Sequence, residues 1–206
     1  VYYPNDYWDY MNVPFMNVDF NELLKKNPDT VGWIKVEGTK VNYPVVQSTD
    51  NDYYLSHAFN KTANQGGWIF ADYRVNFKDF GKNTIIYGHN MNNGTMFAGL
   101  KSFRDQKYAD EHPVFWFITP KYKLLYKVFA VCNSNPYDRK QYGVDGENFK
   151  NNEEFGEAVN YMLKNSVVKM DTDPIEDTDY VMSLSTCTGN SSVRCIVHGV
   201  LLGSVE

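Results

Sequence analysis

A cysteine and an arginine lie close together near the C-terminal end of the sequence. The apolar residues 180–185 predict a strand that carries Cys187 at its end, and the polar turn 188–192 leads into a second apolar strand that starts near Arg194. A fixed cation favours the thiolate, the nucleophilic form of cysteine, and it stabilises a developing oxyanion. Because a guanidinium stays charged at any working pH, it does so without titrating. The pair therefore indicates nucleophilic catalysis by a thiol.

Acyl transfer to a thiol also needs a group that moves protons near neutral pH, and imidazole is suited to this task. Of the four histidines, His89 is the best candidate, because it ends an apolar strand beside a polar loop. His198 shares a strand face with Arg194 but lies about 13 Å further along, too far for both to meet one cysteine. His57 and His112 lie in polar segments and are interpreted as surface or structural histidines.

Two short motifs connect these residues to a known family. Residues 184–187 read Leu-Ser-Thr-Cys and are followed by Arg194, which resembles the sortase signature. Residues 85–90 read Ile-Ile-Tyr-Gly-His-Asn and resemble the strand end that carries the sortase histidine. The order histidine, cysteine, arginine along the chain is also that of the family. The resemblance runs from residue 31 to residue 202 and is greatest for class B sortases.

The resemblance implies a cysteine transpeptidase that cleaves a C-terminal sorting signal of surface proteins after threonine. Cys187 forms a thioester with the signal, Arg194 and backbone N–H groups stabilise the oxyanion, and His89 protonates the leaving amine. The acyl group then passes to an amine of a peptidoglycan precursor or of another cell-wall component. The expected partners are therefore a sorting-signal peptide and a cell-wall amine, and we expect no cofactor and no metal.

Resemblance to class B enzymes assigns substrate contacts to five further residues: Asn51, Leu55, Tyr87, Ser185 and Thr186. Tyr87 and Ser185 each precede a catalytic candidate by two residues, so each shares a strand face with it. Asn51 and Leu55 have alternative interpretations, as a helix cap and as a core residue. Thr186 is expected to contribute its backbone and hydroxyl near the site. Residues 188–189, Thr-Gly, depart from relatives that have an acidic residue directly after the cysteine.

Composition excludes several other classes of protein. The 206 residues carry a net charge of −5, which gives no basic surface for nucleic acid. The three cysteines are an odd number and lack the paired spacing of a structural zinc site. Cys132 lies in an apolar run and is expected to be buried, and Cys195 is expected to face away from the site if Arg194 faces it. No phosphate-binding or dinucleotide motif is present in the sequence.

The hydrophobic pattern predicts a mainly β, α+β protein: a closed or nearly closed, antiparallel-rich barrel of about eight strands. We expect an N-terminal helical cap over residues 1–30, with a helix near 2–11 and a short helix capped by Asp19, and a barrel domain over residues 31–206. A helix before the cysteine strand also matches the class B pattern. We expect further strands over residues 31–36, 40–46, 67–73, 84–89, 114–119 and 122–131. We expect helices over residues 95–103 and 152–165.

Location and alternatives follow from the same reasoning. No apolar run reaches the roughly 18–20 residues that span a bilayer, and the sequence starts at Val1 rather than at methionine. The resemblance implies a membrane tether that precedes Val1, which would hold the enzyme on the extracellular face of the cytoplasmic membrane of a Gram-positive bacterium. The alternatives are a pilus-polymerising sortase, a cysteine hydrolase, and a non-catalytic cell-wall or peptide-binding barrel in which Cys187 is structural.

Overall fold

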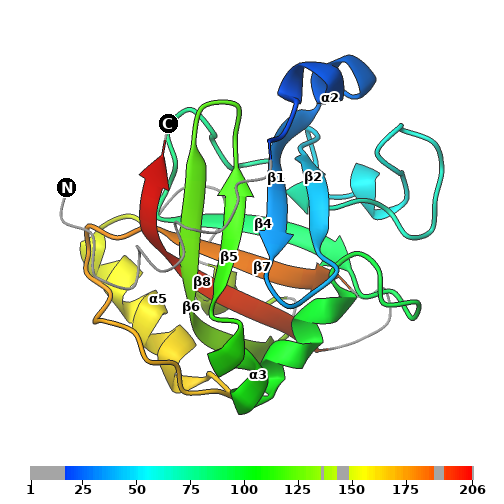
Figure 1. Ribbon diagram of the computed structural model, residues 1–206. Helices are drawn as coiled ribbons and strands as arrows, with labels where there is room; N and C mark the ends of the chain where they lie inside the picture. Colours follow the sequence, from blue (N-terminus) through cyan, green and yellow to red (C-terminus); the bar gives the residue numbers. More distant parts are fainter. Residues whose placement is uncertain (1–16, 136, 143–148, 188–192, 206) are drawn as a thin grey trace.

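The computed structural model describes residues 17–135, 137–142, 149–187 and 193–205. In this part of the chain, eight strands form a closed barrel in the order β1-β2-β3-β4-β7-β8-β6-β5 (Figure 1). The strands are β1 Thr30–Val36, β2 Asn42–Val46, β3 Phe70–Ala71, β4 Asn83–His89, β5 Val114–Ile118, β6 Lys123–Ser134, β7 Val181–Cys187 and β8 Arg194–Val205. Neighbours pair antiparallel except β2 with β3 and β4 with β7. The expected antiparallel-rich barrel is confirmed.

Helices lie outside the barrel and in its connections. They are α2 Phe20–Lys26, α3 Gln106–Glu111, α4 Arg139–Tyr142 and α5 Asn152–Lys164, with the 3₁₀ helices η1 Tyr53–Leu55 and η2 Ala98–Arg104. The expected cap of α2 is confirmed, because the Asp19 carboxylate accepts a hydrogen bond from the Glu22 N–H. The expected helix over 95–103 is a shorter 3₁₀ turn. The expected helix over 2–11 lies outside the described residues, and the domain division at residue 30 stays a prediction.

Helix α5 covers the outer face of β6 (Figure 1). Phe155, Val159 and Met162 bury against β6 and form a second apolar core with it. Leu163 of the same helix is 43% exposed and does not belong to this core. Cys132 is fully buried in the second core, as expected, and burial raises its pKa to about 12.

The expected strand over 67–73 is shorter in the structure because its first residues bind elsewhere. Gly67 has a positive φ of 54°, which takes the backbone out of the strand conformation. The next N–H, that of Trp68, donates to the Tyr54 carbonyl in η1 instead of to a strand. This attachment brings η1 to the barrel wall near the end of β4.

Strands β4, β7 and β8 alternate between the barrel interior and its outer surface. Ile86, Leu184 and Val197 face the interior core, so the residues next to them face outward. Cys195 belongs to the interior core, and burial raises the pKa of its thiol. Cys195 thus points away from the outer face that carries Arg194, as the sequence indicated. Among the described residues, we find no helix of the length and apolar character that a bilayer crossing requires.

Candidate active site

Strand register places the three catalytic candidates in one row. In the parallel β4–β7 pair, His89 lies opposite Cys187. In the antiparallel β7–β8 pair, Ser185 lies opposite Ile196. Beyond this pair, Nη1 of Arg194 donates to the carbonyl oxygen of Thr186, directly before Cys187, at 3.2 Å. Adjacent strands are about 4.8 Å apart. The histidine, cysteine and arginine therefore occupy neighbouring positions across the outer face of three strands, with the cysteine in the middle.

The ring of His89 is held by a backbone carbonyl. Its Nε2 lies 2.7 Å from the carbonyl oxygen of Leu55 in η1. A carbonyl oxygen only accepts hydrogen bonds, so Nε2 has to carry a proton. The hydrogen bond thus fixes the orientation of the ring and favours the tautomer that carries its proton on Nε2.

The approach of η1 to His89 depends on a glycine that the sequence reasoning missed. A Cβ atom at Gly67 would lie 2.3 Å from the Tyr54 carbonyl oxygen and 2.9 Å from Cδ2 of His89. The positive φ of Gly67 is also unfavourable for any residue with a side chain. The Gly66-Gly67 pair before a short strand was the available signal in the sequence.

Arg194 is fixed by the strand that carries the cysteine. Its Nη1 donates to the carbonyl oxygen of Thr186 at 3.2 Å. The buried Nε has no hydrogen-bond partner within the described ranges. The hydroxyl of Thr186 accepts from the Cys195 N–H at 2.9 Å, so this side chain supports the β7–β8 pair. The unusual residues 188–189 lie outside the described residues.

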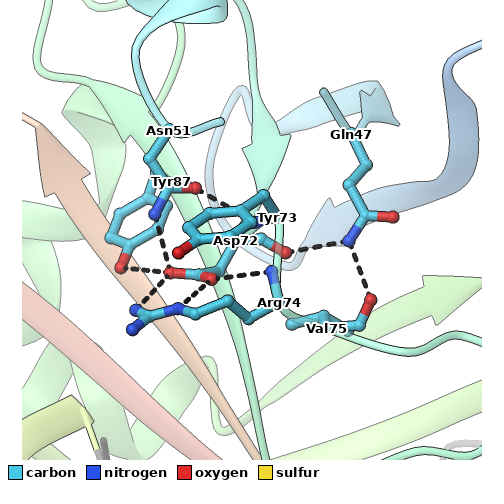
Figure 2. A network of polar contacts seen from close by, with 7 residues as sticks. All are labelled: Gln47, Asn51, Asp72, Tyr73, Arg74, Val75 and Tyr87. Carbon is cyan, nitrogen blue, oxygen red and sulfur yellow. Dashed lines mark hydrogen bonds and ion pairs between the residues drawn. The ribbon is translucent and has the colours of Figure 1, made fainter. Parts of the chain in front are cut away.

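The substrate-contact candidates Asn51 and Tyr87 converge on Asp72, which directly follows β3 (Figure 2). Nδ2 of Asn51 donates to Oδ2 of Asp72 at 2.9 Å, and the Tyr87 hydroxyl donates to the same oxygen at 3.1 Å. Asn51 is not a helix cap: the carboxylate of Asp50, not Asn51, accepts from the N–H groups of 52 and 53 at the start of η1.

Asp72 is a second residue that the sequence reasoning missed. Its side chain is only 2% exposed and pairs with Arg74, whose Nε lies 2.8 Å from Oδ1. Burial alone would raise the pKa of Asp72, but the hydrogen bonds from Arg74 and Asn51 and the guanidinium charge hold it below its ordinary value. An aspartate two residues before an arginine, directly after an apolar strand, was the signal.

The other two substrate candidates differ in exposure. Leu55 is half-buried and packs against a small apolar cluster around Tyr54 and Phe70, so its side chain has the packing role that was the alternative interpretation. Ser185 is fully buried beside Tyr87 in the β4–β7 pair. The roles of all these residues toward substrate stay predictions.

The remaining histidines make other contacts. His198 is fully buried opposite Ser183, and its ring nitrogens lie 2.8 Å from the Ser183 hydroxyl and 2.9 Å from Oε1 of Gln141. Burial lowers the pKa of His198 to about 3. His57 stacks on the Tyr53 ring, and His112 ends α3.

Comparison with known proteins agrees with this geometry. The sortase domain model matches residues 34–202. Sortase B of Listeria monocytogenes is 33% identical over 187 residues, which are 89% of this chain and 74% of the relative. A Staphylococcus aureus sortase B–substrate complex superposes with a TM-score of 0.82 at 31% identity, covering 88% of this chain and 83% of that chain. A sortase B complexed with triglycine superposes with a TM-score of 0.83 at 30% identity, covering 91% of this chain and 85% of that chain.

The sortase domain match includes the strand ends that carry the histidine, the cysteine and the arginine. A non-catalytic cell-wall or peptide-binding barrel is therefore excluded as the explanation of this fold. The chain belongs to the sortase family, class B, and is a cysteine transpeptidase of the kind that anchors surface proteins.

Proposed function

We propose that Cys187 is the nucleophile, His89 the general acid and base, and Arg194 the residue that stabilises the oxyanion. The substrate is a C-terminal sorting signal of a surface protein, cleaved after threonine, and the acceptor is an amine of a peptidoglycan precursor or another cell-wall component. The single observation that supports this most is the His89–Cys187–Arg194 row across β4, β7 and β8.

In the first half of the reaction, the Cys187 sulfur adds to the carbonyl carbon of the threonine. The C–N bond breaks as His89 gives a proton to the leaving amine, and a thioester remains. In the second half, the acceptor amine attacks the thioester carbon, His89 takes its proton, and the sulfur leaves. The carbonyl oxygen carries negative charge in both steps, where a fixed cation contributes most. The unpaired Nε of Arg194 is a donor that the described residues leave unused.

The partners and the location rest on relatives. One similar structure is a sortase B bound to a substrate, and another is a sortase B bound to triglycine, a peptide with a free amine. By analogy, this enzyme takes a signal peptide and an amine acceptor in turn. We place it on the extracellular face of the cytoplasmic membrane of a Gram-positive bacterium, held by an N-terminal tether.

The test is incubation with a library of short peptides of the form x-Pro-x-Thr-x, read by mass spectrometry. We expect a thioester on Cys187 and, when triglycine is added, a ligated product that ends in the added amine. Cys187→Ala should give neither species, whereas Cys132→Ala should give both, because Cys132 lies in the second core. Turnover by Cys187→Ala would contradict the mechanism.

The same assay separates the two rival enzymes. A cysteine hydrolase would give only the free acid with and without triglycine. A pilus-polymerising sortase would prefer a lysine side chain of a protein over triglycine.

A further inference from the structure

The position of His89 depends on two different elements. Strand β4 fixes its backbone, and the Leu55 carbonyl fixes its ring. Leu55 is the last residue of η1, which is a single turn of three residues. Because so short a helical turn is not stable alone, its position depends on the contacts that tie it to the barrel: the Trp68 N–H on the Tyr54 carbonyl, and the side chains that hold the residues next to η1. A residue that ties η1 to β4 therefore controls the geometry at His89.

The Asp72 carboxylate makes this connection (Figure 2). Oδ2 of Asp72 accepts from Asn51, which shortly precedes η1, and from Tyr87, which lies two residues before His89 on β4. Oδ1 of the Asn51 amide accepts a hydrogen bond from the Tyr73 N–H at 3.0 Å. Both ends of this amide are thus bound to the segment that follows β3. One buried carboxylate thereby links the turn that holds the ring to the strand that holds the backbone.

Arg74 fixes the carboxylate itself. Its backbone N–H and its Nε donate to Oδ1 of Asp72 at 3.0 and 2.8 Å, and its Nη2 donates to Oδ2 at 3.0 Å. Each of these partners of the two oxygens is a donor, so only the ionised carboxylate satisfies them all. A carboxamide of the same shape has one acceptor oxygen, and its NH₂ group would meet a donor. Asp72→Asn therefore breaks part of the connection while it hardly changes the volume.

We propose that Asp72 is a positioning residue for His89: its carboxylate fixes η1 against β4 and so keeps the Leu55 carbonyl on Nε2 of the histidine. This inference rests on the proposed role of His89. It also gives Asn51 a different task from the signal contact expected from the sequence, because its amide acts on the site through η1.

The first test measures the tautomer of His89 without any substrate. Protein labelled with ¹⁵N-histidine is compared by NMR as wild type and as Asp72→Asn, with His89→Gln to assign the signal. We expect His89 protonated on Nε2 in the wild type and a mixture of the two tautomers in Asp72→Asn. His112, which lies at the end of α3, should be unchanged. An unaltered His89 signal in folded Asp72→Asn protein overturns the proposal.

The second test measures turnover. Asp72→Asn should lower kcat by about 10–100-fold, the range expected for a misplaced catalytic group, with KM within about twofold of the wild type. Met162→Ala is the matched control, because Met162 lies in the second core under α5 and its loss lowers the melting temperature without touching η1. Met162→Ala should keep the His89 tautomer. If Met162→Ala changed the tautomer as Asp72→Asn does, general destabilisation would be the cause and the proposal would fail.

Smaller substitutions cover the case in which Asp72→Asn does not fold. Asn51→Ala removes the link to η1, and Tyr87→Phe removes only the hydroxyl that links β4. Each should shift the His89 tautomer in the same direction as Asp72→Asn. Where all fold, Asn51→Ala in the Asp72→Asn background should add little, because both act on one connection. Fully additive losses would show separate roles and overturn the proposal. The NMR result holds whether or not His89 is the acid and base, so the two proposals can fail independently.

Discussion

At the scale of single residues, His89 differs from the histidine of a serine-protease triad in what orients it. A triad carboxylate both orients the ring and stabilises the imidazolium that forms. Here the Leu55 carbonyl does the orienting at 2.7 Å, and a carbonyl carries only a partial negative charge. The imidazolium would therefore receive less stabilisation than in a triad, and in the proposed mechanism Arg194, on the other side of Cys187, stabilises the oxyanion instead.

Loss of the imidazole should be costly. General acid–base catalysis typically contributes about 10²–10⁴-fold, so we expect His89→Ala to lower kcat/KM by that factor in the peptide-ligation assay. His112→Ala is the control, because His112 ends α3 and packs on Tyr108. It should retain nearly all activity. Near-normal turnover by His89→Ala would show that another group transfers the proton.

Arg194 should tolerate a change of shape better than a loss of charge. Its proposed task is to stabilise negative charge, and no proton transfer is needed for that. Arg194→Lys keeps the charge but loses the planar set of donors, so partial activity should remain. Arg194→Ala should lower kcat by about 10²-fold or more, comparable to the loss of an oxyanion donor. Steady-state kinetics on one peptide checks both variants, and an unimpaired Arg194→Ala enzyme would remove Arg194 from the mechanism.

At the scale of elements, the regular strands were predictable from the sequence. The contacts that hold the candidate site in place were not. Period-two alternation and turn residues located β1, β2, β4, β5 and β6 within one or two residues in most cases. The same pattern failed at β3, because the N–H of Trp68 binds η1 instead of a strand. Apolar periodicity does not show which backbone groups form hydrogen bonds to a neighbouring turn instead of to a strand.

The parallel pairing of β4 with β7 was also not predictable from local pattern. It joins residues that lie far apart in the sequence, and it sets His89 opposite Cys187. Resemblance supplied these two residues, but only the register explains why they meet. The Asp72 connection was missed for a related reason: its partners Asn51, Arg74 and Tyr87 come from three separate segments, and each looks like an ordinary polar residue in sequence.

Gly67 offers a test of how closely η1 has to approach β4. Gly67→Ala forces a side chain into a positive-φ position and toward Tyr54 and His89, so it should cost about 1–3 kcal/mol of stability and lower kcat. Gly156→Ala is the matched control: a Cβ there meets nothing within 4 Å, and alanine favours the helix α5. Gly156→Ala should raise the free energy of unfolding by about 0.5–1 kcal/mol and leave kcat unchanged. Urea unfolding and kinetics check both, and a fully active Gly67→Ala enzyme would show that η1 can move without harm.

At the scale of the whole molecule, the site exists only when β4, β7 and β8 are paired. β4 and β7 bring together His89 and Cys187, and β8 adds Arg194, so no local segment contains the row. Such long-range pairings form slowly because their loop-closure entropy has to be overcome. Stability of the barrel and integrity of the active site are therefore coupled, and a group that destabilises the barrel wall in acid should affect both.

His198 is such a group, since it lies fully buried between β7, β8 and the Gln141 side chain. Burial lowers its pKa to about 3, whereas an unfolded histidine titrates near a pKa of about 6.5. Between these values the unfolded chain binds one more proton, so the contribution of His198 to stability is complete above about pH 6.5 and falls as the pH decreases.

We therefore expect His198 to account for a loss of about 2 kcal/mol between about pH 7.5 and pH 5. His198→Gln removes the titrating ring, and its free energy of unfolding, measured by urea titration at the two pH values, should change less than that of the wild type by this amount. The variant is expected to be less stable at the higher pH, because the glutamine cannot fill the same space beside Phe129. The comparison of the two pH dependences does not depend on this loss of stability, because each protein is compared with itself at the two pH values. Equal pH dependence in the two proteins would mean that His198 titrates alike in the folded and unfolded states, and the burial argument would be wrong.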